Sequence, residues 1–375
     1  MSEPSRIAVN ASIVGDHPTG LGHYALHVVS ALDALGEHLT VYTSRPDFVD
    51  APRARIRRIS TGVQPERGPL GHLRRLLWTQ TMLWVYVRRD RPRLLLNLTS
   101  EGLLWSSVPQ VTVLHDLLPL IFPEEYPRQQ YYYRHFVPSV LHRSRAVIVP
   151  SESTGRDLIR FYPGVASDRI HVVLLGYDER LFPLGAPAAV EAGREPYALY
   201  VGNVMPHKNL LRVVEAFAVA ARRGPGRLVI RGAGRPRHVR ALRERIARLG
   251  LDSRVDWQPY ASGEALPALY RGARMLLLPS LAEGFGLTAL EAMACGTPVI
   301  TSNTSSLPEV VGDAALLVDP LDTEDLAEAI ARLLADDRLA KELSERGLAR
   351  APQFTWKRTG LGVQAAMLAA LRSAG

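Results

Sequence analysis

Two glutamates flank a glycine loop in the stretch AEGFGLTALEA, residues 282–292. Glu283 precedes the loop, and Glu291 lies one turn into the segment after it, which has the pattern of a helix. Glycines let the backbone approach a ligand closely, and a helix that begins at 287–288 directs free N–H groups at an anion, above all a phosphate. Carboxylates bind phosphate poorly but accept hydrogen bonds from sugar hydroxyls. The pattern therefore indicates a site for a nucleotide diphosphate sugar, with one glutamate at the ribose and the other at the hexose.

A local role for the second glutamate is also open. Thr288 and Glu291 have the spacing of a capping box, in which a threonine at the N-cap is matched by a glutamate three residues later. This interpretation accounts for Glu291 alone and leaves the preceding Glu-Gly-Phe-Gly unexplained.

The composition is that of a two-domain globular protein. The chain has 375 residues, of which 47% are apolar, and it is too long for one comfortable core. Its single cysteine, Cys295, excludes an intramolecular disulfide framework and fits a reducing compartment. The N-terminus lacks the build of a signal peptide, and the most apolar helical run, 76–87, is too short and too polar to span a bilayer. We therefore expect a cytoplasmic protein, or one held peripherally at the inner membrane face.

Short apolar runs alternate with helical patterns along the whole chain. Such runs are typical of buried parallel strands, and their order predicts two doubly wound α/β domains. A Pro- and Gly-rich stretch, 176–196, divides the chain into an N-terminal domain (1–180), a C-terminal domain (190–355) and a final helix (356–375) that packs on the second domain or crosses back to the first. The expected strands are 6–12, 39–43, 94–98, 111–115, 146–150, 170–174, 197–201, 227–231, 254–258, 275–279, 298–302 and 315–319. The expected helices include 23–36, 127–142, 209–222, 236–249 and 263–271.

Four segments resemble motifs of the retaining glycosyltransferases of glycosyltransferase family four. EGFGLTALEAMACGTPVI, with seven residues between its glutamates, resembles the family's donor-site signature. YVGNVMPHKNLLRVVEAF (200–217) resembles the family's segment after the first strand of the C-terminal domain. TGLGHYALHVV (19–29) resembles its N-terminal glycine loop, and VLHDLLPLIFPEEYP (113–127) resembles its His-Asp segment. The resemblance implies the GT-B fold, in which two doubly wound parallel-sheet domains face one another across a cleft. The N-terminal domain would bind the acceptor and the C-terminal domain the nucleotide-sugar donor.

The resemblance also implies a role for each matching residue. Glu291 would bind the donor ribose, and Glu283, with backbone N–H groups of the loop, would hold hydroxyls of the transferred sugar. Lys208 would neutralise the diphosphate, which also meets the first N–H groups of the helix. His115 would lie beside the reacting sugar, so His115, Lys208 and Glu283 are the catalytic candidates. The other implied positions are Gly284, Phe285 and Gly286 in the loop, Leu287 and Thr288 at the helix start, and Gly20 and Gly22, which would let the N-terminal domain approach the β-phosphate and the acceptor.

Several of these residues also have plainer interpretations. Lys208 is one of three lysines in a chain with forty-two arginines, and a compact ammonium suits a crowded diphosphate better than a guanidinium does. The same position would equally suit a solvated lysine before a helix. His115 can be a polar strand end, although ligands of α/β proteins bind at the carboxyl ends of parallel strands. Gly20 and Gly22 can be ordinary loop glycines.

Three further positions are candidates for the donor site. Asn203 stands where many members of the family carry an arginine, and His207 stands where others carry an arginine before the lysine. Arg231 can supply the missing cation, because it precedes the turn GAGRP (232–236). That turn lacks the full dinucleotide-binding pattern and is interpreted as a strand-to-helix connection. Tyr260 lies where the family has a loop that contacts the base, or in a surface turn.

The formal net charge of +8 comes from residues 53–93. Eleven arginines stand there against Glu66 and Asp90, a local charge of +9 (11 − 2). Within it, 71–89 places apolar residues and tryptophans between arginine pairs, which suits a helix in a membrane interface as well as a core helix with basic ends. The stretch predicts either a solvated basic face or an anionic partner, such as a phospholipid membrane or a phosphate-bearing acceptor. No nucleic-acid-binding module accompanies the charge, so nucleic acid is not expected.

The prediction is a retaining glycosyltransferase that moves a hexose from a nucleotide diphosphate donor to a saccharide, lipid-linked or small-molecule acceptor. GDP-mannose is the donor we expect first, because 113–127 and 206–217 look most like segments of mannosyl- and rhamnosyltransferases. No Asp-x-Asp triplet occurs in the chain, so we expect no metal and no other cofactor. Lys208, the loop amides and the helix terminus would then stabilise the leaving phosphate. A nucleotide-sugar epimerase of the same fold and a non-catalytic nucleotide-sugar-binding subunit stay open as alternatives.

Overall fold

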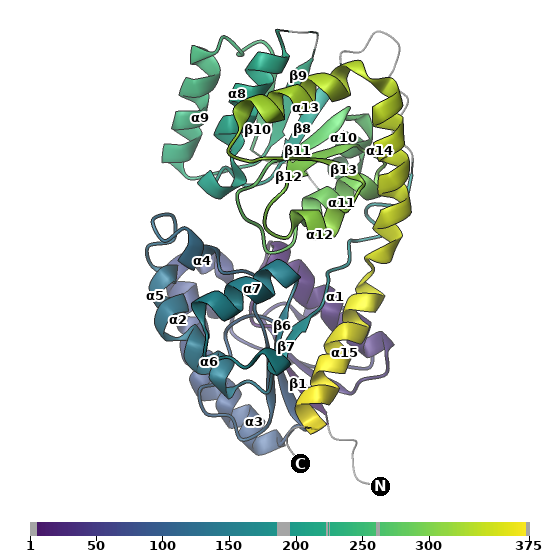
Figure 1. Cartoon of the computed structure of the whole chain (residues 1–375). Coiled ribbons are helices and arrows are strands. Elements are labelled where there is room, and N and C mark those ends of the chain that lie inside the picture. Colours follow the sequence, from purple (N-terminus) through teal and green to yellow (C-terminus); the bar gives the residue numbers. More distant parts are fainter. Residues whose placement is uncertain (1–5, 186–195, 223, 225, 260–262, 373–375) are drawn as a thin grey trace. The chain divides into compact units, whose positions relative to one another are not determined.

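The computed structural model describes residues 6–185, 196–222, 224, 226–259 and 263–372. They form two compact units (Figure 1). Unit 1 comprises the chain up to Gly176 together with the segment from Trp356 onward, and unit 2 is Tyr177–Thr355.

Unit 1 is built on a seven-stranded parallel sheet in the order β3-β2-β1-β4-β5-β6-β7. β1 pairs with β2 on one side and β4 on the other, so the winding direction changes at β1. The strands are β1 (Ile7–Asn10), β2 (Leu39–Thr43), β3 (Arg55–Arg58), β4 (Leu94–Asn97), β5 (Gln110–Val113), β6 (Ala146–Val149) and β7 (Ile170–Val172). The helices are α1 (Gly20–Ala34), α2 (Gly68–Trp78), α3 (Trp84–Asp90), α4 (Leu118–Ile121), α5 (Gln129–His135), α6 (Val137–Arg143), α7 (Glu152–Phe161) and α15 (Trp356–Arg372).

Unit 2 has a six-stranded parallel sheet in the order β10-β9-β8-β11-β12-β13. Its winding direction changes at β8, which pairs with β9 and β11. The strands are β8 (Tyr197–Val201), β9 (Arg227–Arg231), β10 (Val255–Gln258), β11 (Met275–Leu278), β12 (Val299–Ser302) and β13 (Ala315–Val318). The helices are α8 (Leu210–Ala220), α9 (Pro236–Arg248), α10 (Leu266–Gly272), α11 (Leu287–Ala294), α12 (Leu307–Val311), α13 (Thr323–Ala335) and α14 (Asp337–Arg350). The predicted pair of doubly wound parallel-sheet domains is confirmed.

The predicted strands are found because the central strands are buried on both faces. Every residue of β1, β4, β5 and β6 is buried, and such strands must be apolar over most of their length. β3 was overlooked because it reads Arg-Ile-Arg-Arg and lies at the sheet edge, where its end residues are exposed. Arg57 on this strand pairs with Asp90 at 2.6 Å.

The final helix, α15, packs on α1 in unit 1. A Cβ atom at Gly360 would lie 2.7 Å from the Cβ of Ala31, so a glycine is needed where the two helices cross. Thr359 donates a hydrogen bond from Oγ1 to the carbonyl of Leu174 at 2.9 Å. The ring of Trp356 stacks on His27 with 4.6 Å between centroids. These contacts join the end of the chain to its first unit.

Two predicted helices differ from the structure. The pattern at 127–142 forms two helices, α5 and α6, because Pro138 stands in the first turn of α6 and cannot continue α5. The pattern at 71–89 is part of one helical stretch from Gly68 to Asp90, in which a π-helical turn (Thr79–Leu83) joins α2 to α3. Among the described helices, none combines the length and apolar character needed to cross a membrane.

Candidate functional site

The predicted donor residues meet at the carboxyl ends of the two central strands of unit 2. Lys208 lies in a 3₁₀ turn (Pro206–Lys208) that follows β8, and Glu283 lies in the loop that follows β11. β8 and β11 are neighbours in the sheet, so these loops leave the same edge where the winding direction changes. Ligands of open α/β sheets bind at this position.

Lys208 and Glu283 form an ion pair. The Lys208 Nζ lies 2.6 Å from Glu283 Oε1, and the Ser280 hydroxyl donates to the same oxygen at 2.7 Å. The side chains of Lys208 and Glu283 are only 21% and 10% exposed. A short, charge-assisted hydrogen bond in a partly buried setting holds both charges in place. The sequence motifs predict separate roles for these two residues and do not indicate this direct contact.

Backbone contacts hold the two loops together. Leu281 donates from its amide to the carbonyl of His207 at 2.7 Å. Asn209, in the left-handed conformation with φ 62°, donates from Nδ2 to the carbonyl of Pro279 at 3.0 Å. The position of the Lys208 ammonium is therefore set by rigid backbone on both sides.

The glycine loop ends at the start of α11. Gly286 has φ 114°, and a Cβ atom there would lie 2.7 Å from a methyl group of Leu307, so only glycine fits without strain. Gly286 is the N-cap, and no side chain caps the helix. The amides of Leu287 and Thr288 thus open the helix, as the anion-site prediction requires. The capping-box interpretation is wrong, because Thr288 lies inside the helix and not at its N-cap.

Two serines that were not predicted from the sequence hold the glycine loop through hydrogen bonds to its backbone. Ser305, with φ 59°, accepts a hydrogen bond from the amide of Glu283 at 3.0 Å and donates to its carbonyl at 2.8 Å. The Ser306 hydroxyl lies 2.7 Å from the carbonyl oxygen of Phe285 and 3.0 Å from that of Glu283. Their only sequence signal is a run of small polar residues directly after the buried strand β12.

Replacing Ser306 with alanine is expected to lower stability by about 1 kcal/mol, the usual net contribution of one hydrogen bond. This corresponds to roughly 2–4 °C in Tm for a domain of this size. A looser loop should also raise the KM for the donor. Thermal unfolding and steady-state kinetics check both effects, and a variant with wild-type Tm and KM would show that Ser306 does not support the loop.

Glu291 lies one turn into α11 and is held by a tyrosine. The Tyr270 hydroxyl of α10 donates to Glu291 Oε2 at 2.9 Å. Burial raises the pKa of Glu291 to about 7, although the hydrogen bond from Tyr270 acts in the opposite direction. Tyr270 carried no sequence signal, because it stands within an ordinary apolar helix pattern.

The other unit 2 candidates are placed differently. Asn203 is exposed in the loop after β8. Arg231 is buried, and its guanidinium Nη2 lies 2.9 Å from Asp256 Oδ2, so its charge is already balanced. The predicted turn after β9 is confirmed, and its first glycine, Gly232, is required because a Cβ atom would lie 1.8 Å from the carbonyl oxygen of Gly202. Tyr260 lies outside the described residues.

In unit 1, His115 follows β5 and is fixed by two neighbours. Its Nε2 lies 2.9 Å from the carbonyl oxygen of Leu98, and its ring meets the Tyr24 ring edge-on with 4.5 Å between centroids. A carbonyl oxygen can only accept, so Nε2 carries the proton and Nδ1 has the free lone pair. Burial lowers the pKa of His115 to about 4. The imidazole is therefore neutral at pH 7 and can accept a hydrogen bond at Nδ1.

Gly20 and Gly22 lie in the first turn of α1 and not in the loop before it. A Cβ atom at Gly20 would meet nothing within 4 Å, whereas at Gly22 it would lie 3.1 Å from Pro18. Tyr24 extends from the next turn of the same helix to His115. Both glycines and His115 therefore lie near the amino-terminal end of α1.

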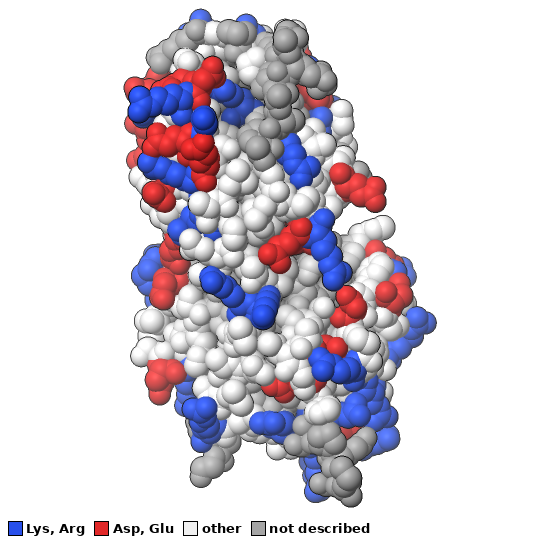
Figure 2. Space-filling view, turned by 90° about the vertical axis from the view of Figure 1, so that its right-hand side faces the viewer, with Lys and Arg blue, Asp and Glu red and all other residues white. Residues whose placement is uncertain are grey.

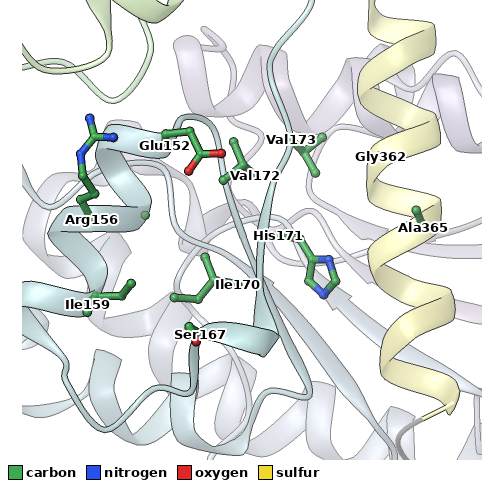
Figure 3. A pocket seen from close by; sticks show the side chains of 11 residues that line it. Glu152, Arg156, Ile159, Ser167, Ile170, His171, Val172, Val173, Gly362 and Ala365 are labelled. Carbon is green, nitrogen blue, oxygen red and sulfur yellow. The ribbon is translucent and has the colours of Figure 1, made fainter.

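A cavity of about 570 Å³ lies elsewhere in unit 1, beside the edge strand β7. Figure 3 shows Glu152 and Arg156 from α7, His171 from β7 and Ala365 from α15 around it. No predicted site residue is among those that line this cavity. The cavity is thus separate from the candidate site.

Two family models match the chain. The model described as Glycosyltransferase Family 4 matches residues 18–181, and the one described as Glycosyl transferases group 1 matches residues 187–350. The second match contains Lys208, Glu283 and Glu291.

Three relatives of this chain are named as glycosyltransferases. O-antigen chain mannosyltransferase B of Escherichia coli is 32% identical over 66% of this chain and 67% of its own length. D-inositol 3-phosphate glycosyltransferase of Saccharomonospora viridis is 35% identical over 57% of this chain and 53% of its own length. The serotype-specific mannosyltransferase WbdA of Escherichia coli is 28% identical over 70% of this chain, which spans only 33% of that relative.

Solved structures share the fold. Sucrose-phosphate synthase from Thermosynechococcus elongatus superposes with a TM-score of 0.79 at 24% identity, covering 99% of this chain and 100% of the other. WaaG, a glycosyltransferase involved in lipopolysaccharide biosynthesis, gives 0.70 at 19% identity, covering 96% and 99%. The domain matches, the mannosyltransferase relative and the two doubly wound sheets agree with one another. The chain belongs to glycosyltransferase family four and is a glycosyltransferase with the GT-B fold.

Proposed function

We propose that the chain transfers a hexose from a nucleotide diphosphate sugar to an acceptor hydroxyl and retains the configuration at the anomeric carbon. The Lys208–Glu283 pair beside the uncapped start of α11 is the observation that carries the proposal. A fixed cation and a helix N-terminus suit a diphosphate. Glu291, one turn further on, supplies the second carboxylate that a nucleotide sugar needs.

Each of the three charged donor-site residues binds a different part of the donor. Glu291 accepts hydrogen bonds from the ribose, and Glu283 accepts them from the hexose. Both contacts that Glu283 makes with Lys208 and Ser280 use Oε1, which leaves Oε2 for a sugar hydroxyl. The Lys208 ammonium has three N–H donors, so it can hold Glu283 and a phosphate oxygen together.

The transfer proceeds on one face of the sugar. The bond between C1 and the β-phosphate oxygen breaks while the acceptor oxygen bonds to C1 from the same side. The acceptor's proton passes to the departing phosphate oxygen. Lys208 and the N–H groups at the start of α11 stabilise the charge that develops there. Because these groups supply that stabilisation, the proposal includes no divalent metal.

Mannose carried by GDP is the first donor to test. Two of the relatives named above are mannosyltransferases. A structure of HepE from Anabaena, which has 19% identity and TM-score 0.75, is described as a complex with UDP and glucose, so UDP-glucose is the natural competitor. The acceptor is a saccharide, a lipid-linked sugar or a small molecule. For unit 1, His115 is proposed to bind a sugar hydroxyl through Nδ1.

A panel of GDP-mannose, UDP-glucose, UDP-galactose and dTDP-rhamnose tests the proposal. The true donor is expected to raise Tm, because it binds the folded chain, and with an acceptor it should yield an α-linked product from an α-linked donor. Anomeric configuration is read by NMR. A β-linked product from that donor would overturn retention. Conversion of the donor alone into a second sugar nucleotide would identify an epimerase, and donor binding without turnover would identify a non-catalytic subunit.

A further inference from the structure

The helical stretch from Gly68 to Asp90 exposes an apolar face. Its apolar side chains recur at helical spacing. The wide π-helical turn adds one residue to the interval between Leu77 and Met82, so the apolar residues of α2 and of the segment after it stay on one face. Such a row of large apolar side chains is unusual on a protein surface. The members of this leucine face, 44–58% exposed, are Leu70, Leu73, Leu77, Met82 and Val85.

The opposite side of α2, which is buried, is polar. Arg75 is 5% exposed and binds Glu101 through two hydrogen bonds of 2.5 and 2.8 Å. Although burial alone would raise it, the Arg75 charge and hydrogen bonds from His72 and Arg75 lower the pKa of Glu101 to about 2. Thus α2 holds a charge inside and leucines outside, the reverse of an ordinary surface helix.

Packing prevents this helix from turning its leucines inward. A Cβ atom at Gly71 would lie 2.3 Å from the carbonyl oxygen of Gln64, so the buried side admits nothing larger than glycine there. Rotation would also carry Arg75 away and leave the buried Glu101 carboxylate without its cation, which is strongly destabilising. The leucine face is therefore a fixed feature of unit 1.

Arginines surround the leucine face. Arg74, Arg88 and Arg89 are exposed on the same stretch, and Arg67 is exposed directly before it. Arg88 lies over the Trp84 ring at 5.3 Å. By contrast, Figure 2 shows a face of the molecule on which acidic and basic side chains are interspersed. Apolar residues bordered by cations are the pattern of helices that lie in the interface of an anionic membrane.

We propose that the leucine face docks unit 1 on a membrane that contains anionic lipids. The apolar side chains enter the headgroup region, and the flanking arginines contact lipid phosphates. A second copy of the chain suits this face poorly, because a two-fold contact would bring the same arginines together. The proposal does not depend on the identity of the donor.

Vesicle sedimentation of the full-length chain tests the docking. Binding is expected to vesicles of phosphatidylcholine with 30% phosphatidylglycerol, to weaken with salt, and to be lost in the double variant Leu73→Gln/Leu77→Gln. The matched control replaces Leu361 and Leu368, exposed on α15 at 44% and 40%, and should bind like wild type. Unchanged circular dichroism and donor-induced Tm shifts confirm that both variants fold.

The charge contribution is tested separately with Arg74→Gln/Arg88→Gln. Each basic residue near an anionic surface contributes about a factor of five, so binding should weaken roughly 25-fold. Absence of binding to anionic vesicles at low salt, or equal binding to neutral vesicles, would overturn the proposal. A concentration-dependent dimer that disappears in Leu73→Gln/Leu77→Gln would overturn it in favour of self-association. Activity towards the donor serves as the independent readout of the proposed transfer reaction.

Discussion

Replacing Lys208 with alanine is expected to lower kcat by about 10²–10³, the loss that follows removal of one preorganised group aimed at developing charge. In the proposed transfer, negative charge grows on the β-phosphate as the sugar departs. The Lys208 ammonium is held 2.6 Å from Glu283, which lies four residues before the first residue of α11. Because the charge is larger in the transition state than in the bound donor, kcat should fall more than donor affinity does.

Steady-state kinetics with the identified donor check this expectation. Lys341→Ala is the matched control, because Lys341 is another lysine of unit 2 whose side chain is 79% exposed. A kcat within threefold of wild type would remove Lys208 from the mechanism. The same assay in excess EDTA tests the metal-free proposal. Activity should persist, and inhibition that added metal reverses would contradict it.

Lys208→Ala also leaves Glu283 with the Ser280 hydroxyl but without its cation. Lys208→Arg separates the two roles. A guanidinium restores the charge beside Glu283 but does not reproduce the compact ammonium at the phosphate. We expect it to restore Tm while kcat stays low. Full recovery of kcat would show that any cation at this position suffices.

Replacing Glu291 with glutamine is expected to weaken binding of the bare nucleoside diphosphate by about 1–1.5 kcal/mol, or roughly 5–13-fold, because the proposed charge-assisted hydrogen bond to the ribose becomes a neutral one. The backbone should not be disturbed, because Glu291 makes its hydrogen bond with the Tyr270 hydroxyl and does not cap α11. Isothermal calorimetry at pH 8 measures the effect. Unchanged affinity together with a lower Tm would assign Glu291 a purely structural role.

The pH dependence gives a second measure of the same residue. With its pKa at about 7, Glu291 becomes protonated as pH falls below 7, and a ligand that needs the carboxylate should then bind roughly tenfold more weakly per pH unit. The diphosphate also gains a proton near this range, so the difference between wild type and Glu291→Gln isolates Glu291. The variant should show the shallower decline, and parallel curves would contradict this assignment.

The pH dependence of folding stability should be opposite to that of ligand binding, because protonation of Glu291 favours the folded state. Its folded pKa is raised above the ordinary value of 4.5, so the folded state holds the proton more tightly than the unfolded state. The contribution of the protonated Glu291 carboxyl to the free energy of unfolding is therefore complete below pH 4.5 and is lost as pH rises through 7. Glu291→Gln should therefore leave Tm unchanged or raised at pH 8.

Sequence alone determined the doubly wound sheets and most strand positions. Buried parallel strands must be apolar nearly throughout, so β8 and β9 could be located to the residue. The glycine loop could also be located from the sequence, because Gly286 has a positive φ that residues with a side chain adopt only with strain. The resemblance to family four depended on these short-range patterns, and the family matches agree with it.

Only the tertiary structure decided which side chains meet. Lys208 and Glu283 are 75 residues apart, and their contact exists because β8 and β11 are neighbours in the sheet. The partner of Glu291 is Tyr270 on another helix, whereas the sequence pattern offered only the nearby Thr288. In the sequence, Arg75 is one of eleven arginines in 53–93, and only the fold places Glu101 beside it. Residue type and spacing determine local backbone and burial, but strand order determines which loops share an edge, and a side chain's partner and charge state follow from that edge.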